Sequence, residues 1–278
     1  MPPITADEEY SKNSKLKKEN IQQLRNWLTK QPHLPTGITD EQLILFLHCC
    51  QYSLEASKHT IESYYSIRTH APDEIVVLPK RDQHGNVLLA GRIVDTDVSK
   101  FVYDDCLKAW FMLQDINLLE EGAVPGFIFL FDLKDCKIGH VTSMKISSIK
   151  KYFMYIQEAF PGVVIANHMI NMNPVAETFV NMCKPFMKKE LLIKLHLHST
   201  MDTLLEHITK DALPKEFGGN LDSLTEYHKV TLEQLEKFRG WFKKEEEFRV
   251  DESKRPGKAK NAGDVFGVEG SFKKLDID

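Results

Sequence analysis

The spacing of apolar residues between positions 163 and 198 predicts a strand, an amphipathic helix and a second strand. Val163 to Ile170 is a nearly unbroken apolar run, too short for a globular helix, which favours a strand buried on both faces of a parallel sheet. Asn173-Pro174 then indicates a turn and the start of a helix. The apolar stripe of this helix runs through positions 175, 176, 179, 180, 183, 186 and 187, and Pro185 is expected to break or kink it. From Leu191 to His198 apolar residues alternate with lysine and histidine, which is typical of a half-buried strand.

The same periodicities assign elements to the rest of the chain. Helices are expected over residues 16–28, from a capping box at Thr39 and Gln42, and after a cap at Ser53. The expected strands cover 87–94 and 126–132, and the expected helices that follow cover 104–119, 143–160 and 231–248, the last capped by Thr231. Strand, helix and strand over 126–170 form a βαβ unit, so the sheet is predicted to be at least partly parallel.

The predicted fold class is therefore α/β with an added helical unit. A small all-helical N-terminal domain is expected over residues 1–80, and the mostly parallel sheet with flanking helices over 81–250, including the last helix. Residues 251–278 are rich in lysine, glycine, aspartate and glutamate, and this composition favours a charged tail that is disordered or straps the surface.

Three short motifs within this frame carry a family resemblance. They are H-x-I-N-x-x-P at 168–174, K-P-F at 184–186 and L-P-x-E-F-G-G at 213–219. In this order and spacing the chain resembles the CRAL-TRIO lipid-transfer family from about Thr39 to about Tyr227. The resemblance implies a lipid-binding domain whose sheet is covered by a gate helix, and a helical domain before it.

Composition and charge narrow the function classes. The chain has 278 residues, 42% hydrophobic and 27% charged, which is ordinary for a globular protein. Its net charge of −4 gives no basic field for nucleic acid, and no apolar run approaches the roughly 20 residues of a membrane span. The N-terminus lacks the apolar core of a signal peptide, and the five cysteines show no CxxC spacing. We therefore expect reduced thiols and a cytoplasmic location, with only peripheral membrane contact.

No motif for catalysis, metal binding or cofactor binding stands out. His196 and His198 lie two apart on one strand face, but a metal site needs a further ligand, so we interpret them as partly exposed histidines and expect no metal. Nucleophile-elbow, P-loop, dinucleotide and zincin motifs are absent, and we expect no enzyme activity and no cofactor. A dispersed hydrolase triad stays a distant alternative. Asp132 resembles the aspartate of the family's F-D-L motif, where it is structural.

The chain is unusually rich in large, soft apolar side chains. Phe127, Phe129 and Phe131 point to one side of their strand because strand side chains alternate with period two. From composition alone a plain hydrophobic core is the favoured interpretation. The resemblance reverses that ranking, because in the family one sheet face and its helices enclose an apolar cavity that holds one lipid.

Carrying the family's features over assigns residues to the site. The segment 175–193 is expected to be the gate helix. The expected ligand-binding residues are Cys106, Ala109, Leu113, Phe129, Phe131, Tyr152, Tyr155, Phe160, Val164, Phe179, Cys183 and Met187. Where phosphoinositide-responsive members carry basic residues, this chain has Val163, Ile165, Glu190 and Leu192. Phosphoinositide contact is thus expected to be weak and to fall to Arg68, Lys188, Lys189 and Lys194.

The sequence therefore predicts a cytosolic carrier. It would bind one hydrophobic ligand, such as a tocopherol, a retinoid, a carotenoid or another isoprenoid or lipid, and transfer it between membranes. Its partners would be that small molecule and, transiently, a membrane, with no nucleic acid. The alternative is a signalling or trafficking adaptor whose lipid pocket is vestigial and whose charged tail binds a partner.

Overall fold

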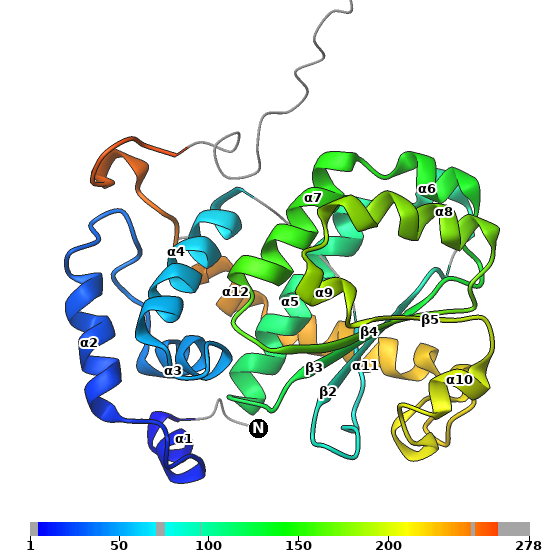
Figure 1. Ribbon diagram of the computed structural model, residues 1–278, viewed down its shortest axis with the longest axis horizontal. Helices are drawn as coiled ribbons and strands as arrows, with labels where there is room; N and C mark the ends of the chain where they lie inside the picture. The colour runs from blue at the N-terminus through cyan, green and yellow to red at the C-terminus, as the bar shows by residue number, and fades with distance from the viewer. Residues whose placement is uncertain (1–4, 71–75, 95, 246–247, 261–278) are drawn as a thin grey trace, which may run out of the picture.

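The parallel sheet predicted from the sequence forms the centre of the molecule (Figure 1). The computed structural model describes residues 5–70, 76–94, 96–245 and 248–260; the side chains of residues 63–70, 76 and 243 lie outside the description. In these ranges the sheet has five strands in the order β1-β2-β3-β4-β5. They are β1 (Val76–Val77), β2 (Val87–Arg92), β3 (Phe127–Asp132), β4 (Val164–Ile170) and β5 (Leu195–His198). β1 pairs antiparallel with β2, and all other pairs are parallel.

Sequential strand order places the connecting helices on one face of the sheet. Crossover connections between parallel strands are right-handed in nearly all proteins. Because each connection here leads to the adjacent strand in the same direction across the sheet, all connecting helices lie on the same face. Figure 1 shows this layer above the sheet. It contains α5 (Tyr103–Glu121), α6 (Ile138–Ser143), α7 (Ile146–Met154), α8 (Pro174–Cys183) and α9 (Lys189–Leu192). The other face carries α10 (Met201–Leu205) and α11 (Leu224–Lys237), which is followed by α12 (Arg239–Glu245).

The alternation of β3 separates two hydrophobic cores. Phe127 and Phe129 pack in the core beneath α5 and α7, whereas Ile128 and Leu130 pack with α10 and α11 on the opposite face. This confirms that the phenylalanines of the strand share one side. The sequence did not predict α6, nor the π-helical turn Tyr155–Ala159 that ends α7.

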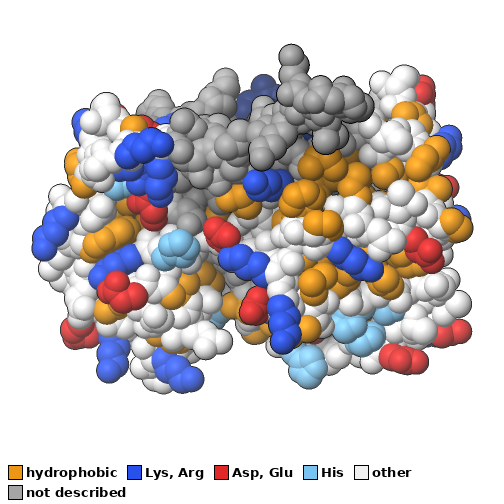
Figure 2. All heavy atoms as spheres, turned by 45° about the horizontal axis from the view of Figure 1, so that its top comes forward, with side chains coloured by type: hydrophobic (Ala, Val, Ile, Leu, Met, Phe, Trp, Pro, Cys, Tyr) orange, Lys and Arg blue, Asp and Glu red, His pale blue; other side chains and the backbone are white. Residues whose placement is uncertain are grey.

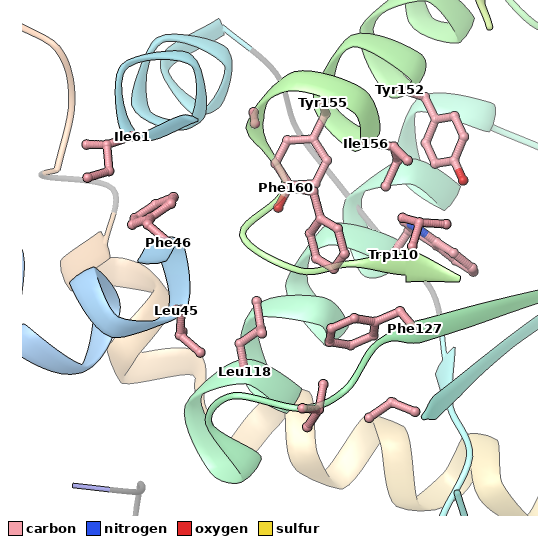
Figure 3. Packing of buried hydrophobic residues seen from close by; sticks show 14 of the residues in the cluster. Leu45, Phe46, Ile61, Trp110, Leu118, Phe127, Tyr152, Tyr155, Ile156 and Phe160 are labelled. Carbon is pink, nitrogen blue, oxygen red and sulfur yellow. The ribbon is translucent and has the colours of Figure 1, made fainter. Parts of the chain in front are cut away.

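The N-terminal helices share the first of these cores. They are α1 (Ala6–Lys12), α2 (Lys18–Leu28), α3 (Asp40–Cys49) and α4 (Leu54–His70). Thr39 and Gln42 form the predicted capping box of α3. Figure 3 shows Phe46 and Ile61 of these helices in the same cluster as Leu118, Phe127 and Phe160 of the sheet module. The N-terminal helices and the sheet module are therefore joined by continuous apolar packing, and the expected boundary at residue 80 stays a prediction.

The C-terminal helices differ from the expectation. The single helix predicted over 231–248 begins earlier, at Leu224, because the Ser223 side chain accepts from the Glu226 amide and caps it. The cap predicted at Thr231 is wrong, since Thr231 lies inside the helix and is buried. Phe238 then separates α11 from α12. No helix in the described ranges has both the length and the apolar character needed to cross a bilayer.

The L-P-x-E-F-G-G motif locks the loop before α11 onto the sheet module. Phe217 is fully buried beneath the sheet, and the Glu216 carboxylate accepts the Leu224 amide at 3.0 Å while pairing with Arg92 of β2 at 3.4 Å. Gly218 has φ +71°, a conformation that favours glycine. The Leu213 carbonyl lies so close to Gly219 that a Cβ there would come within 1.9 Å of it. The motif is thus explained by packing and backbone geometry.

Residues 248–260, the C-terminal strap, cross the N-terminal helices. Val250 is buried in their core, and the Asp251 amide donates to the His33 carbonyl. Arg255 is 8% exposed; it donates to Glu252 at 2.6 and 2.7 Å and also pairs with Glu62 of α4. Of the two behaviours expected for the tail, its described part shows surface strapping. Residues beyond 260 lie outside the described ranges.

Replacing Arg255 with alanine is expected to destabilise the protein by about 1–3 kcal/mol, because two partly buried carboxylates lose their partner. Burial alone would raise the pKa of Glu62, but hydrogen bonds from His33 and Arg255 lower it to about 2. This stabilisation is present above the ordinary carboxyl pKa near 4.5 and is lost as the pH falls toward 2. Urea unfolding at pH 7 and pH 3.5 measures both effects.

The matched control is Lys254→Ala, since Lys254 pairs with Asp251 at the exposed edge of the same strap. Its free energy of unfolding is expected to stay within about 0.5 kcal/mol of the wild type. If R255A and K254A had the same small effect, the Arg255 contacts would not hold the strap.

Candidate functional site

An apolar cavity of about 430 Å³ lies between the carboxyl ends of the central strands and the helices above them. β3 contributes Phe131, β4 contributes Met169, and α8 covers the cavity with Phe179 and Cys183. α5 contributes one helical face to the cavity wall, with residues three and four positions apart along the helix. They are Tyr103, Cys106, Leu107 and Trp110. Its volume falls in the range of about 300–1,000 Å³ that is typical of small-molecule sites.

Aromatic rings form a continuous wall between β3 and α5. The indole of Trp110 stacks on Phe131 with ring centroids 4.7 Å apart and meets the edge of Phe129 at 4.8 Å. Tyr152 of α7 stands edge-on to Trp110 at 6.4 Å. Figure 3 shows Trp110 and Tyr152 lying side by side under the helices. These ring contacts order the wall, so the cavity has a fixed apolar shape rather than a loosely packed core.

Two thiols and two phenols of the cavity wall are neutral at physiological pH. Burial raises the pKa of the Cys183 thiol to about 12, and burial also raises the pKa of Cys136. The pKa values of the Tyr103 and Tyr152 phenols also lie well above their usual range, chiefly because of burial. Since only a thiolate is a strong nucleophile, these cysteines are poor candidates for covalent catalysis.

Polar side chains gather where the cavity passes the strand ends. They belong to Arg92, Lys100, Asp105, Asp132 and His228. Asp132 accepts from the Asn171 amide nitrogen at 2.7 Å and from the Lys134 backbone at 3.0 Å. These bonds tie the ends of β3 and β4 together, which fits the structural role expected for this aspartate.

The structure brings five of the twelve expected ligand-binding residues onto the cavity wall. These are Cys106, Phe131, Tyr152, Phe179 and Cys183. Phe129, Tyr155, Phe160, Val164 and Met187 lie instead in the hydrophobic core next to it. Ala109 and Leu113 point from the opposite side of α5 and pack near α11 and α12. Ala109 is three positions after Cys106, but the wall follows the stripe through Leu107 and Trp110, so Ala109 and Leu113 fall outside it.

Sequence reasoning missed most of the wall. The wall residues it did not name include Leu107, Trp110, Leu133, Cys136, Met144, Phe153 and Met169. Extending the helical spacing from Cys106 by one and four residues would have found Leu107 and Trp110. Leu133 and Cys136 lie in a loop, where no periodicity marks the side that faces the cavity.

The segment expected to be the gate helix is interrupted at Pro185, as predicted. α8 ends at Cys183, Lys184–Phe186 form a 3₁₀ turn, and α9 follows. Figure 1 shows α8 and α9 in the helix layer above the sheet. Met187 is buried, whereas Leu192 and Ile193 at the end of the segment are exposed at 37% and 71%. We call the whole connection between β4 and β5, residues 171–194, the gate segment; it includes the expected gate helix at 175–193. It carries cavity-lining residues in its first half and exposed apolar residues in its second.

Three of the four residues expected to contact phosphoinositides have described side chains. Lys188 pairs with Glu158 at 2.9 Å, and the Lys194 ammonium donates to the Val164 carbonyl at 2.6 Å. Lys189 is exposed. The side chain of Arg68 lies outside the described residues.

β5 is shorter than the strand predicted over 191–198, and its buried side chains differ from the predicted ones. β5 begins at Leu195 because residues 189–192 are helical. His198 is 3% exposed and Leu197 is 46% exposed, so the interpretation of His198 as partly exposed is wrong. The structure also places His168 and His207 beside these histidines. Within the described ranges, no three metal-binding side chains are arranged to hold an ion.

Comparisons with known proteins agree with this architecture. The family model described as "CRAL/TRIO domain" matches residues 72–219, and the one described as "Pinta-like, UBA domain" matches residues 13–74. The "Alpha-tocopherol transfer protein-like" proteins of Mus musculus and Homo sapiens are each 24% identical over 239 residues, which covers 79% of this chain and 70% of theirs. "Clavesin-1" of Mus musculus is 23% identical over 235 residues, covering 77% of this chain and 66% of its own.

Among solved structures, "Crystal structure of Sfh5" aligns with a TM-score of 0.44 at 12% identity, covering 76% of this chain and 92% of that one. The CRAL/TRIO match spans more than half of the sequence and includes β1 to β5, the gate segment and the L-P-x-E-F-G-G loop. The chain therefore belongs to the CRAL/TRIO domain family.

Proposed function

We propose that this protein is a non-enzymatic, cytoplasmic carrier that binds one hydrophobic ligand in the cavity and transfers it between membranes. The observation that carries the proposal is the cavity itself, walled by stacked aromatic rings and neutral thiols and covered by α8. Burying about 500 Å² of apolar ligand surface contributes on the order of 12 kcal/mol before entropic and desolvation costs. That is enough for tight binding of a tocopherol, a retinoid, a carotenoid or another lipid.

A buried donor in the wall indicates a polar group on the ligand. Trp110 is 1% exposed, and its indole N–H has no hydrogen-bond acceptor among the described residues. An unsatisfied buried donor costs about 1–3 kcal/mol. The nitrogen is covered by neighbouring atoms, so a hydroxyl or carbonyl oxygen on the ligand would accept this hydrogen bond and orient the molecule once the ring shifts toward the cavity. The proposed ligand is therefore mostly apolar with one oxygen that contacts the cavity wall.

Exposed apolar side chains near the cavity support contact with a membrane. Val94 and Val102 line the cavity and are exposed at 72% and 49%, and Ile138 and Ile146 on α6 and α7 are exposed at 55% and 51%. Figure 2 shows hydrophobic side chains scattered over the half of the molecule where these helices lie. These groups could insert into a membrane without relying on charge.

Binding of the protein to vesicles is therefore expected to vary little with salt concentration. Added phosphatidylinositol bisphosphate is expected to increase this binding only weakly, and vesicle binding across a salt series with and without this lipid measures both effects.

The test is to extract lipid from protein purified from its own cells and identify it by mass spectrometry. Retinol, α-tocopherol and palmitic acid are then offered to delipidated protein, and transfer of each bound probe between vesicles is followed. A stoichiometric lipid together with transfer supports the proposal. No bound lipid and no uptake of any probe would leave the adaptor interpretation, and turnover of ester substrates would indicate a hydrolase.

A further inference from the structure

Four histidines meet on the sheet face opposite the cavity. His168 lies on β4, His196 and His198 on β5, and His207 just after α10. β4 and β5 pair His168 with His196 and Ile170 with His198, so all three strand imidazoles share one face with Ile170, which packs against α10. Every pair of the four rings has centroids between 4.6 and 6.4 Å apart. We call this group the histidine cluster.

Hydrogen bonds define the protonation of the two buried rings. The Thr203 hydroxyl donates to the Thr200 carbonyl at 2.9 Å, so the Nδ1 of His198, 2.9 Å from that oxygen, carries the proton and donates. The Nε2 of neutral His198 is then an acceptor, and His168 Nδ1, 2.8 Å away, donates to it. A single added proton can be kept in this bond, because a protonated ring donates to the other ring when that ring is neutral and carries its proton on its far nitrogen. When both rings are protonated, two N–H groups face each other, so the bond between the β4 and β5 side chains is lost in the doubly protonated state.

The charges that act on the cluster come from its own rings. Burial, followed by His196, His198 and His207, lowers the pKa of His168 to about 3. Burial, followed by His207 and His196, lowers the pKa of His198 to about 4, and burial and His207 also lower the pKa of His196. The charged residues that neighbour the cluster in the sequence are Lys194 just before β5, Asp202 on α10 and Glu206 just after α10. The neutral Gln83 side chain reaches the His207 carbonyl.

The cluster sits at the base of the gate segment. β4 leads into α8, and α9 leads into β5, so the two strands that the histidines connect are the two ends of residues 171–194. In the described ranges β5 is an edge strand that pairs only with β4. Besides the backbone ladder of the parallel pair, the side chains of His168 and His198 join the two strands, and Lys194 just before β5 donates to the Val164 carbonyl of β4. Weakening the histidine cluster would therefore weaken the pairing of β5 with β4, which fixes both ends of the gate segment.

We propose that the histidine cluster is a proton-operated clip that holds β5 against β4 when neutral and releases β5 with the gate segment when protonated. An anionic membrane surface attracts protons as it attracts other cations, so it would favour the open form where a carrier unloads. This coupling to ligand exchange rests on the function proposed above, whereas the opening of β5 does not.

The direction of the pH effect follows from the lowered pKa values. In the open form the rings regain their ordinary pKa near 6.5, so the open form binds more protons than the closed form. The clip is therefore fully closed above pH 6.5 and loses stability as the pH falls from there toward 4. Between pH 7.5 and 5.5 each buried histidine contributes roughly a 10-fold shift toward the open form.

Hydrogen exchange of the full-length protein tests the clip without any ligand. Protection factors, corrected for the intrinsic effect of pH, are compared at pH 7.5 and 5.5. The amides of β5 and of the gate segment are expected to lose on the order of 100-fold protection, since two buried histidines act together. The amides of β2 and β3 serve as the internal reference and are expected to change little.

Three variants separate the clip from other causes. His198→Gln should reduce the pH response of β5 to roughly 10-fold, because one buried ring remains. His207→Gln removes an exposed ring 4.6 Å from His196 and should shrink the response without disturbing the fold. His84→Gln, at an exposed histidine in another loop, should leave it unchanged.

An unchanged response in both cluster variants, or an equal loss of protection in β2 and β3, would overturn the proposal. So would an opening that depends on added zinc and disappears with a chelator. Transfer of retinol between vesicles, measured over the same pH range, then tests the coupling. If β5 opens but no probe is ever bound or transferred, the proposed function fails while the clip stands.

Discussion

Replacing Phe131 with aspartate is expected to abolish ligand binding while the protein stays folded. Phe131 lines the cavity and is only half-buried, so the unliganded protein can keep the new carboxylate in contact with water. A hydrophobic ligand would remove that water and leave a charge against apolar groups, which costs several kcal/mol. The loss of stacking on Trp110 adds to this cost. We expect an affinity loss of at least about 100-fold, measured by fluorescence titration with retinol or with the ligand identified by mass spectrometry.

Phe131→Leu is the matched control, because it shortens the side chain but keeps the wall apolar. Its affinity is expected to stay within about 10-fold of the wild type. Circular dichroism and urea unfolding establish that both variants are folded. A folded F131D protein that binds every probe as tightly as the wild type would show that the ligand does not occupy this cavity.

Much of the fold follows from periodicity and from one helix-breaking proline. The apolar runs of β3 and β4 and the stripe of α8 are each long enough to identify the element, and the structure has them within a few residues of the predicted bounds. Pro185 ends α8 as expected because its ring cannot continue the helical hydrogen bonds. The parallel arrangement then follows from the strand, helix, strand order.

The sequence was less informative where a tertiary contact overrides local pattern. In β5 the leucines were the apparent inward face, but His198 is buried because His168 and Thr203 satisfy both its nitrogens. A hydrophobic pattern does not detect a buried polar network, since each member is acceptable only when its partners are present. The early start of α11 has a similar origin, because the Ser223 cap follows a loop fixed by Glu216.

The site was predicted only in part for a geometric reason. Residues on strands and helices could be assigned a face, and Phe131, Cys106 and Cys183 do line the cavity. Which of two buried faces of α5 borders the cavity depends on where α11 and α12 pack, and this is set by residues far away in the sequence. Ala109 and Leu113 face those helices. Their role in ligand binding stays a prediction.

Gly219→Ala is expected to be strongly destabilising although it adds a single methyl group. A Cβ at this position would lie 1.9 Å from the Leu213 carbonyl oxygen and 2.3 Å from its carbon, and neither is part of a flexible side chain that can move away. The same carbonyl accepts the Leu221 amide at 2.9 Å, and the Gly219 amide donates to the Pro214 carbonyl at 3.0 Å. The loop can accept the methyl group only by breaking these bonds or by displacing Phe217 from its core.

The expected loss in the free energy of unfolding is about 3 kcal/mol or more, as for severe overpacking of a core. Urea unfolding followed by tryptophan fluorescence measures it. Gly240→Ala is the matched control, because a Cβ there meets nothing within 4 Å and the residue lies in α12. Alanine favours a helix over glycine, so G240A should stabilise the protein by up to about 1 kcal/mol. If G219A unfolded within about 0.5 kcal/mol of the wild type, the second glycine of the L-P-x-E-F-G-G motif would not be required by packing, and its presence would need a different explanation.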